Sequence, residues 1–244
     1  MALPRFFCPI PMKLGETVDL PPAVANHAGR ALRLREGTEI ILFNGSGGQF
    51  HAYLRFEQGQ AQAELFDFDP SDRLLKGQIT LVQALASGDK MDWIIEKAVE
   101  IGVHRLIPVQ AERSILQLQG ARLEKRQQHW QAIAQAASEQ CGRNQLLQLE
   151  PVQSLQQCLQ ILGPSDNCLC DPDAEISLRE HLLATPERSE LRLFIGPEGG
   201  WSEKETALMQ KQGAVAVRFG ERVLRTETAG LALASASAAL LNWF

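Results

Sequence analysis

The sequence predicts an α/β fold preceded by a small all-β module, and three observations carry this prediction. Up to about residue 73 the apolar runs are short and separated by turn-forming residues, which is typical of short strands. From about residue 79 compact apolar runs alternate with segments of helical periodicity, which indicates a mainly parallel sheet. The 244 residues, 45% of them hydrophobic, are enough for two modest domains with buried cores.

The all-β module is predicted from its strands and turns. Residues 38–56 (TEIILFNGSGGQFHAYLRF) predict two strands around a glycine-rich turn, and residues 61–69 (AQAELFDFD) alternate apolar with polar side chains. The turn resembles a dinucleotide-binding fingerprint, but Phe50 replaces its last glycine and a strand follows, so we reject a cofactor there. Residues 70–77 (PSDRLLKG) predict a linker, which places the domains at 1–73 and 74–244.

The α/β part is predicted to begin with a strand and a helix. Residues 79–86 (ITLVQALA) form a compact apolar strand. Asp89 can cap a helix over residues 90–101, whose apolar side chains recur at helical spacing, and Gly102 is the expected stop.

The remaining elements continue the alternation. Residues 122–142 predict a long amphipathic helix, and Ser202 with Glu205 forms a capping-box pattern at the start of another helix. Further strands are expected at residues 105–111, 167–170, 192–195 and 214–219.

Cysteine usage and hydropathy bear on the compartment. The five cysteines are scattered without zinc-finger spacing, so we expect packing cysteines in a cytoplasmic protein and no metal site. The longest charge-free apolar tract follows Glu227, contains polar residues and is at the short limit for a bilayer span. We therefore expect a buried helix there and no membrane contact.

Charge is unevenly spread along the chain. The net charge of −5 argues weakly against nucleic acid. Residues 1–37, however, hold five Arg and Lys residues against three acids, and residues 104–143 hold six against three. A protein that meets RNA on one face needs a local basic surface and not a basic total, although an ordinary mixed-charge surface gives the same pattern.

Three loops follow the carboxyl ends of predicted strands, where open α/β sheets bind ligands. They are CDPDA (170–174), GPEGG (196–200) and GERVLRTETAG (220–230). The paired glycines of the second loop expose backbone that a ligand can approach, and a tight turn that touches nothing is the alternative. The chain lacks GKS or GKT phosphate loops and GxGxxG, so ATP and NAD fit poorly.

These loops together resemble the signature of the trefoil-knotted (SPOUT) RNA methyltransferases. The resemblance rests on LFIGPEGGWSEKE (193–205) followed by FGERVLRTETAGLALASASAAL (219–240). More narrowly, the chain is similar to the RsmE family of 16S ribosomal RNA uridine-N3 methyltransferases. ANHAGRALRLREG, GDKMDWIIEKAVEIGV, RLIPVQAERS and ASEQCGRN stand in family order, so the resemblance covers nearly the whole chain.

The resemblance implies the fold and the partners. It implies an N-terminal PUA-like β-barrel that binds RNA, a C-terminal trefoil-knotted SPOUT methyltransferase domain and a homodimer. It also implies S-adenosylmethionine as methyl donor and 16S rRNA, in the small ribosomal subunit, as substrate. Two alternatives stay open: a knotted enzyme that methylates a ribose 2′-hydroxyl, and a non-catalytic RNA-binding assembly factor.

The late loops are implied to hold the cofactor, largely through main-chain groups. The residues expected to bind it are Cys170, Ile195, Gly196, Pro197, Gly199, Gly200, Phe219, Gly220, Val223, Leu224 and Thr228.

Three charged residues of these loops are candidates for catalysis. Arg225 can stabilise the anion that develops on the uracil carbonyls. Glu198 and Glu227 are candidate bases for the N3 proton. Each carboxylate has a structural alternative, since Glu198 can face solvent from a turn and Glu227 can favour its helix N-terminus.

The RNA contacts are expected from the barrel and from the end of the long helix. An arginine at the end of a helix is also ordinary helix capping, but the resemblance favours contact with RNA. The residues expected to contact RNA are Arg5, Lys13, Arg30, Arg33, Glu139, Gln140, Arg143 and Asn144.

Overall fold

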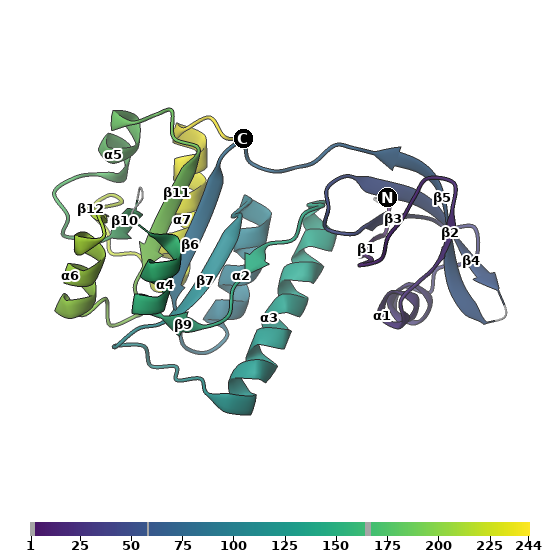
Figure 1. Cartoon of the computed structure of the whole chain (residues 1–244), viewed down its shortest axis with the longest axis horizontal. Helices are drawn as coiled ribbons and strands as arrows, with labels where there is room; N and C mark the ends of the chain where they lie inside the picture. The colour runs from purple at the N-terminus through teal and green to yellow at the C-terminus, as the bar shows by residue number, and fades with distance from the viewer. Residues whose placement is uncertain (1–2, 58, 164–166) are drawn as a thin grey trace. The chain divides into compact units, whose positions relative to one another are not determined.

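The computed structural model describes residues 3–57, 59–163 and 167–244 (Figure 1). The chain forms two compact units. The first consists of Met1–Arg73 together with Ser138–Leu146, and the second of Leu74–Ala137 together with Leu147–Phe244. Each unit has its own sheet.

A five-stranded sheet forms the first unit. Its order is β1-β3-β4-β5-β2, with β3, β4 and β5 antiparallel and β1 parallel to β3. Alternate side chains of β3, β4 and β5 point into one core, which includes Ile40, Leu42, Leu54 and Leu65. The bounds are β1 Arg5–Phe7, β2 Thr17–Asp19, β3 Glu39–Phe43, β4 Gln49–Glu57 and β5 Gln60–Asp69.

The predicted glycine-rich hairpin joins β3 to β4. Gly45, Gly47 and Gly48 all have positive φ angles there, and a Cβ at Gly48 would lie 2.5 Å from the Phe68 ring. Position 48 therefore requires glycine, because its backbone has a positive φ angle and because a side chain would collide with Phe68. The helical segment α1 (Pro22–Asn26) and the π-helical turn His27–Ala31 were not predicted.

The segment Ser138–Leu146 completes the first unit through hydrogen bonds. Arg5 donates to the Asn144 amide oxygen at 2.7 Å, and Asn144 donates to the Ser71 carbonyl at 3.1 Å. The backbone N–H of Phe7 donates to Glu139 at 2.9 Å. Residues far apart in the sequence thus hold β1 and the end of the module together.

A parallel sheet forms the second unit, as predicted. Its order is β12-β10-β11-β6-β7-β8, and β9 also pairs with β7. The bounds are β6 Gln78–Ala84, β7 Arg105–Gln110, β8 Gln148–Leu149, β9 Gln153–Ser154, β10 Asn167–Cys170, β11 Glu190–Ile195 and β12 Val215–Val217.

Helices cover both faces of this sheet. On one face Val82 and Phe194 share a core cluster with side chains of α4 and α6. On the other face α7 packs against β6, β11, α2 and α5. The bounds are α2 Lys90–Ile101, α3 Gly120–Cys141, α4 Leu155–Leu162, α5 Leu178–Ala184, α6 Glu203–Lys211 and α7 Thr226–Leu240.

The helix ends follow the predicted signals with one difference. Gly102 ends α2 in the left-handed conformation, with φ 94°. Ser202 and Glu205 form the predicted capping box of α6, with both reciprocal hydrogen bonds. Asp89 precedes α2 as predicted, but its side chain makes no capping hydrogen bond, because its backbone lies near φ −91° and ψ 9° instead of the extended conformation of a capping residue.

The small residues of α7 let this helix lie close to the sheet. A Cβ at Gly230 would lie 2.9 Å from Leu81 Cδ1 and 3.2 Å from Ile195 Cγ1. Eight residues of α7 are buried. Close packing against the sheet of the same chain therefore accounts for the many small residues of this helix.

The two ends of the second unit meet. The Lys76 N–H donates to the Trp243 carbonyl at 2.8 Å, and a Cβ at Gly77 would overlap the Trp243 indole, at 2.1 Å.

The α/β fold class is confirmed. None of the described helices combines the length and apolarity that crossing a bilayer requires.

Candidate functional site

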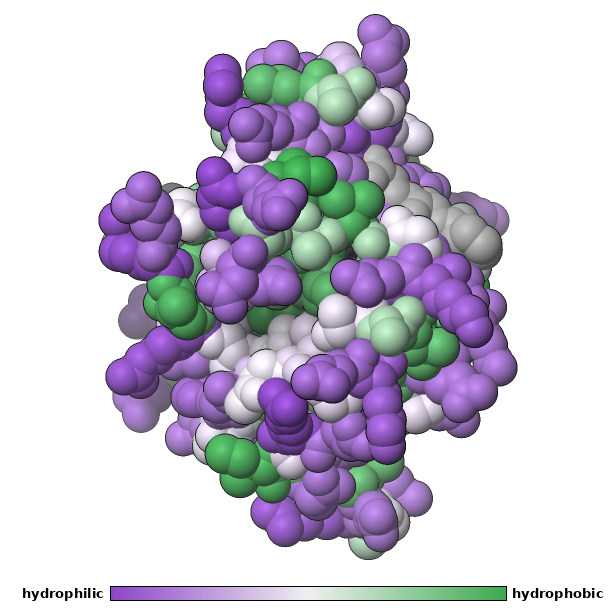
Figure 2. Space-filling model, turned by 90° about the vertical axis from the view of Figure 1, so that its left-hand side faces the viewer, coloured by the Kyte–Doolittle hydropathy of each residue, from purple (hydrophilic) through white to green (hydrophobic). Residues whose placement is uncertain are grey.

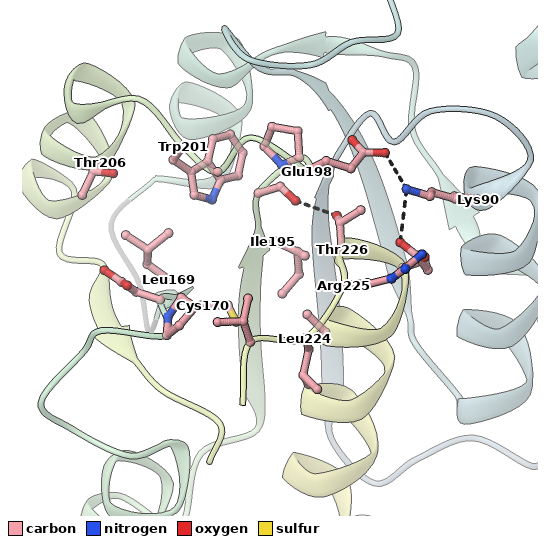
Figure 3. A pocket seen from close by; sticks show the side chains of 18 residues that line it. Lys90, Leu169, Cys170, Ile195, Glu198, Trp201, Thr206, Leu224, Arg225 and Thr226 are labelled. Atoms are coloured by element: carbon pink, nitrogen blue, oxygen red, sulfur yellow. Dashed lines mark hydrogen bonds and ion pairs between the residues drawn. The ribbon is translucent and has the colours of Figure 1, made fainter. Parts of the chain in front are cut away.

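A cavity of about 650 Å³ opens where β10 and β11 end (Figure 3). It lies between the three predicted loops and the N-terminal end of α7, within the second unit. Its volume is in the range of small-molecule and cofactor sites. Figure 2 shows apolar residues exposed between hydrophilic ones on this side of the second unit.

Apolar side chains form one wall of the cavity. Leu169 of β10, Ile195 of β11 and Leu224 line it, and Figure 3 shows all three around the same space. Trp201 lines it as well, and its buried indole N–H has no hydrogen-bond acceptor among the described residues. A buried donor of this kind costs free energy unless a ligand or water accepts from it, so a polar ligand atom fits beside Trp201.

The GPEGG loop presents backbone to the cavity at Gly196 and Gly200. Gly200 has φ +68° and open space around its missing side chain. At Gly199 a Cβ would lie 3.3 Å from the Arg113 Cβ, and Arg113 donates to the Gly199 carbonyl at 3.2 Å. Gly199 packs against Arg113 and lies outside the cavity lining.

A buried hydroxyl joins this loop to α7. Thr226 Oγ1 donates to the Gly196 carbonyl at 2.6 Å (Figure 3). It also accepts from Gln83 Nε2 at 3.0 Å. Gln83, at the end of β6, is fully buried and also donates to the Ala84 carbonyl. The network therefore fixes the first residue of α7 against two strand ends.

Lys90 and two carboxylates form an ion cluster at the cavity edge. Lys90 Nζ lies 2.7 Å from Glu198 Oε1 and 3.6 Å from Glu227 Oε2 (Figure 3). Glu198 Oε1 also accepts from Ser87 Oγ at 2.7 Å and from the Ser87 N–H at 3.1 Å. All three charged residues line the cavity.

Hydrogen bonding separates the two carboxylates chemically. Burial alone would raise the pKa of Glu198, but hydrogen bonds from Lys90 and Ser87 outweigh it and lower the pKa to about 2. The same contact with Glu198 raises the pKa of the Lys90 ammonium. Glu227 Oε2 is buried and has no hydrogen-bond donor among the described residues. A carboxylate of such low pKa is a weak base, so Glu227 is the better placed of the two candidate bases.

The structure brings most of the predicted cofactor residues together. Seven of them line the cavity: Cys170, Ile195, Gly196, Pro197, Gly200, Val223 and Leu224. The three candidate catalytic residues line it too, namely Glu198, Arg225 and Glu227. Phe219, Gly220 and Thr228 belong to the same segment but lie outside the lining, as Gly199 does.

Sequence reasoning missed several residues of the site. Four of them stand inside the predicted loops without having been singled out: Asp171, Pro172, Thr226 and Ala229. Leu169, Trp201 and Thr206 lie just outside the loops, so a wider window around each motif would have included them. Lys90 stands 108 positions before Glu198, and nothing in the local sequence signals their pairing.

The predicted RNA-contacting residues fall into two groups. Lys13, Arg30, Arg33 and Gln140 are exposed. Arg143 and Asn144 are only 3% and 2% exposed, because this segment is buried in the first unit. Arg5 is half-buried, with its guanidinium 5.1 Å from the centre of the Phe43 ring. Glu139 accepts from the backbone of Phe7, so these residues have structural partners.

The sequence matches two family models. Residues 73–238 match the family described as RNA methyltransferase domain, and residues 20–64 match the RNA methyltransferase PUA domain. The first match covers more than half of the chain, and the second falls within the five-stranded sheet unit.

Relatives of this chain have been described by function and by structure. The ribosomal RNA small subunit methyltransferase E of Bacillus subtilis is 33% identical over 86% of this chain and 85% of its own. The Neisseria gonorrhoeae enzyme of the same name, bound to S-adenosylmethionine, is 36% identical with a TM-score of 0.89 over 98% of each chain. A Legionella pneumophila methyltransferase in complex with the same cofactor is 29% identical to this chain, with a TM-score of 0.91, also over 98% of each chain.

Proposed function

We propose, because this chain belongs to the RNA methyltransferase family, that it transfers the methyl group of S-adenosylmethionine to N3 of a uridine in 16S ribosomal RNA. The observation that carries the proposal is the cavity of the second unit, in which the GPEGG and RVLRTETA segments meet. The name of the relatives, small subunit methyltransferase E, supports 16S rRNA as the substrate.

The residues present fit S-adenosylmethionine. Leu169, Ile195 and Leu224 offer an apolar wall for a flat ring system, and the Trp201 N–H offers a donor that lacks an acceptor in the described chain. Gly200 leaves room for a ligand against the backbone, and Gly196 lines the cavity with Trp201 packed against it. When bound, the cofactor supplies an electrophilic methyl group on a sulfonium.

The transfer step needs a deprotonated N3 and an aligned donor. Glu227 takes the N3 proton, the N3 electron pair forms the new N–C bond, and the sulfur–methyl electron pair stays with sulfur. Arg225 stabilises the negative charge that spreads onto the uracil carbonyls. Holding the two reactants in line supplies much of the acceleration, because well-oriented pairs gain roughly 7–11 kcal/mol.

Methyl transfer from labelled S-adenosylmethionine tests the function. We expect N3-methyluridine when the acceptor is small ribosomal subunits or naked 16S rRNA, and the comparison of the two shows which the enzyme prefers. A ribose 2′-O-methyl product would show that the enzyme methylates the ribose and not N3 of the uracil. Binding of RNA without transfer would leave the assembly-factor alternative. The homodimer stays a prediction, which light scattering measures.

A further inference from the structure

Lys90 holds a fixed position beside the cavity although it lies outside the signature loops. It is the first residue of α2, and its ammonium group is anchored on Glu198 Oε1 at 2.7 Å. That oxygen is itself held by the side chain and the backbone N–H of Ser87. The ammonium group is therefore held by a carboxylate of the GPEGG loop that Ser87 of the β6–α2 loop fixes in turn.

The contact of Lys90 with Glu227 is of a different kind. At 3.6 Å it is an ion pair longer than an ordinary hydrogen bond, and the Glu227 side chain is 17% exposed. A cation at this distance attracts the carboxylate electrostatically. The ion pair thus holds the Glu227 carboxylate at the cavity edge, where a substrate base would enter.

The charged groups that line the cavity decide how Glu227 responds. Lys90 and Arg225 are the cations, and Glu198 and Asp171 are the other carboxylates. Glu198 and Glu227 share the Lys90 ammonium group, so removing it leaves two like charges at one cavity edge. Removing the charge of Glu198 instead leaves Lys90 to act on Glu227 alone.

We propose that Lys90 is a positioning residue for methyl transfer: anchored by Glu198 and Ser87, it keeps Glu227 ionised and directed for proton removal from N3. The inference rests on the proposed function. It predicts opposite effects of two substitutions. Lys90→Met moves the acid limb of the pH–rate profile to higher pH by about one unit, and Glu198→Gln moves it to lower pH.

The test measures single-turnover rates across pH with saturating cofactor and RNA, with N3-methyluridine as the product analysed. Lys90→Arg keeps the charge and should restore most of the wild-type profile. Lys97→Met is the matched control, because Lys97 lies on the same helix and pairs with Glu96 and Glu100 outside the cavity lining. It should leave the profile in place. The proposal is overturned if the acid limb stays at the wild-type pH in Lys90→Met and Glu198→Gln, or if both variants only lose rate equally at every pH.

A second measurement does not depend on activity. Carbon-13 NMR of protein labelled at glutamate carboxyl carbons follows each titration, and the Glu227→Gln variant assigns the Glu227 signal. We expect its midpoint to rise in Lys90→Met and to fall in Glu198→Gln, relative to wild type. Equal midpoints in all three proteins overturn the role of Lys90 even if no methyl transfer is observed. Wild-type protein without N3-methyluridine, but with shifted midpoints, overturns only the assigned reaction.

Discussion

Arg225 stands directly before α7 with an extended backbone, at φ −66° and ψ 151°, and lines the cavity beside Glu227. Its planar guanidinium can donate two parallel hydrogen bonds to a uracil carbonyl edge, which a lysine ammonium cannot reproduce. The residue thus combines a fixed backbone with a geometry suited to a delocalised anion.

Arg225→Lys is therefore expected to lower the single-turnover rate by about tenfold to hundredfold while cofactor affinity changes little. Raising the pH should partly rescue the variant, because more N3 is then deprotonated without help. Rates and calorimetric affinities measured across pH check this. A loss confined to cofactor binding, at every pH, would show that Arg225 only braces the loop.

Gly200 and Gly213 provide a matched pair of left-handed glycines, at φ +68° and φ +84°, both with open space around them. Valine at either position should cost about 1–2 kcal/mol of folding free energy through backbone strain. Only Gly200→Val should also weaken S-adenosylmethionine binding, because Gly200 lines the cavity and Gly213 does not. Urea unfolding and calorimetry give the two quantities. Equal affinities in both variants would remove Gly200 from the cofactor site.

Glu198 links the site to acid stability. Its pKa of about 2 lies below the value near 4.3 of an unfolded glutamate, so its stabilisation is complete above pH 4.3 and is lost as the pH falls through about 2. Between pH 6 and pH 3 wild type should therefore lose more stability than Glu198→Gln, for which Glu203→Gln at an exposed site is the control. Urea unfolding at both pH values measures it. Parallel losses would contradict the low pKa.

The sequence could predict residues that stand in the three signature loops, because motif spacing places them at adjacent strand ends. It could not predict that Gly199 turns towards Arg113, since the partner lies 86 positions away. Nor could it predict the burial of Arg143 and Asn144, because a polar sequence at the end of a helix is ordinarily exposed.

At the scale of elements, the N-terminal end of α7 is held by the Thr226 hydroxyl between Gly196 and Gln83. A valine there has a similar shape but removes the donor to the half-buried Gly196 carbonyl and one of the two acceptors of the buried Gln83 amide. The Thr226 hydroxyl oxygen thus links the GPEGG loop to the start of α7.

Thr226→Val should accordingly cost about 1–3 kcal/mol of stability and weaken cofactor binding. Thr226→Ser keeps the hydroxyl and should retain most of both. Thr228→Val, at an exposed position of the same helix, should stay within about 0.5 kcal/mol of wild type. Denaturant unfolding compares the three. A loss in Thr228→Val as large as in Thr226→Val would point to helix propensity instead of the hydrogen bonds.

Elements with strong periodicity or caps were predictable, and short ones were not. Gly102 and the Ser202–Glu205 box mark helix ends through local chemistry, and both are confirmed. The two-residue strands β8 and β9 and the turn His27–Ala31 carry no period long enough to detect. Their conformation depends on tertiary contacts.

At the scale of the whole molecule, the first unit is discontinuous in sequence. A fragment of residues 1–73 lacks Glu139 and Asn144, and with them partners of Phe7, Arg5 and Ser71. It should be less stable by roughly 3 kcal/mol than a fusion that adds residues 138–146 after a flexible linker. Circular dichroism melting compares the two. Identical melting temperatures would show that residues 1–73 are sufficient.

Chain threading was beyond residue-level prediction. Periodicity identifies parallel strands and helices, but a knot breaks the rule that chains do not pass through their own loops. The resemblance of the GPEGG and RVLRTETA segments supplied the knotted fold class, and composition could not have done so.

The meeting of Lys76 and Gly77 with Trp243 allows that threading to be examined separately from the contacts. Because the ends of the second unit are neighbours, a short link can join them and the chain can be cut elsewhere. Such a circular permutant keeps the same side-chain neighbours while its free end moves to a different place along the knot. If the expected knot forms, refolding rates should differ between permutants, because passing a chain end through a loop takes time; equal rates would contradict the threading.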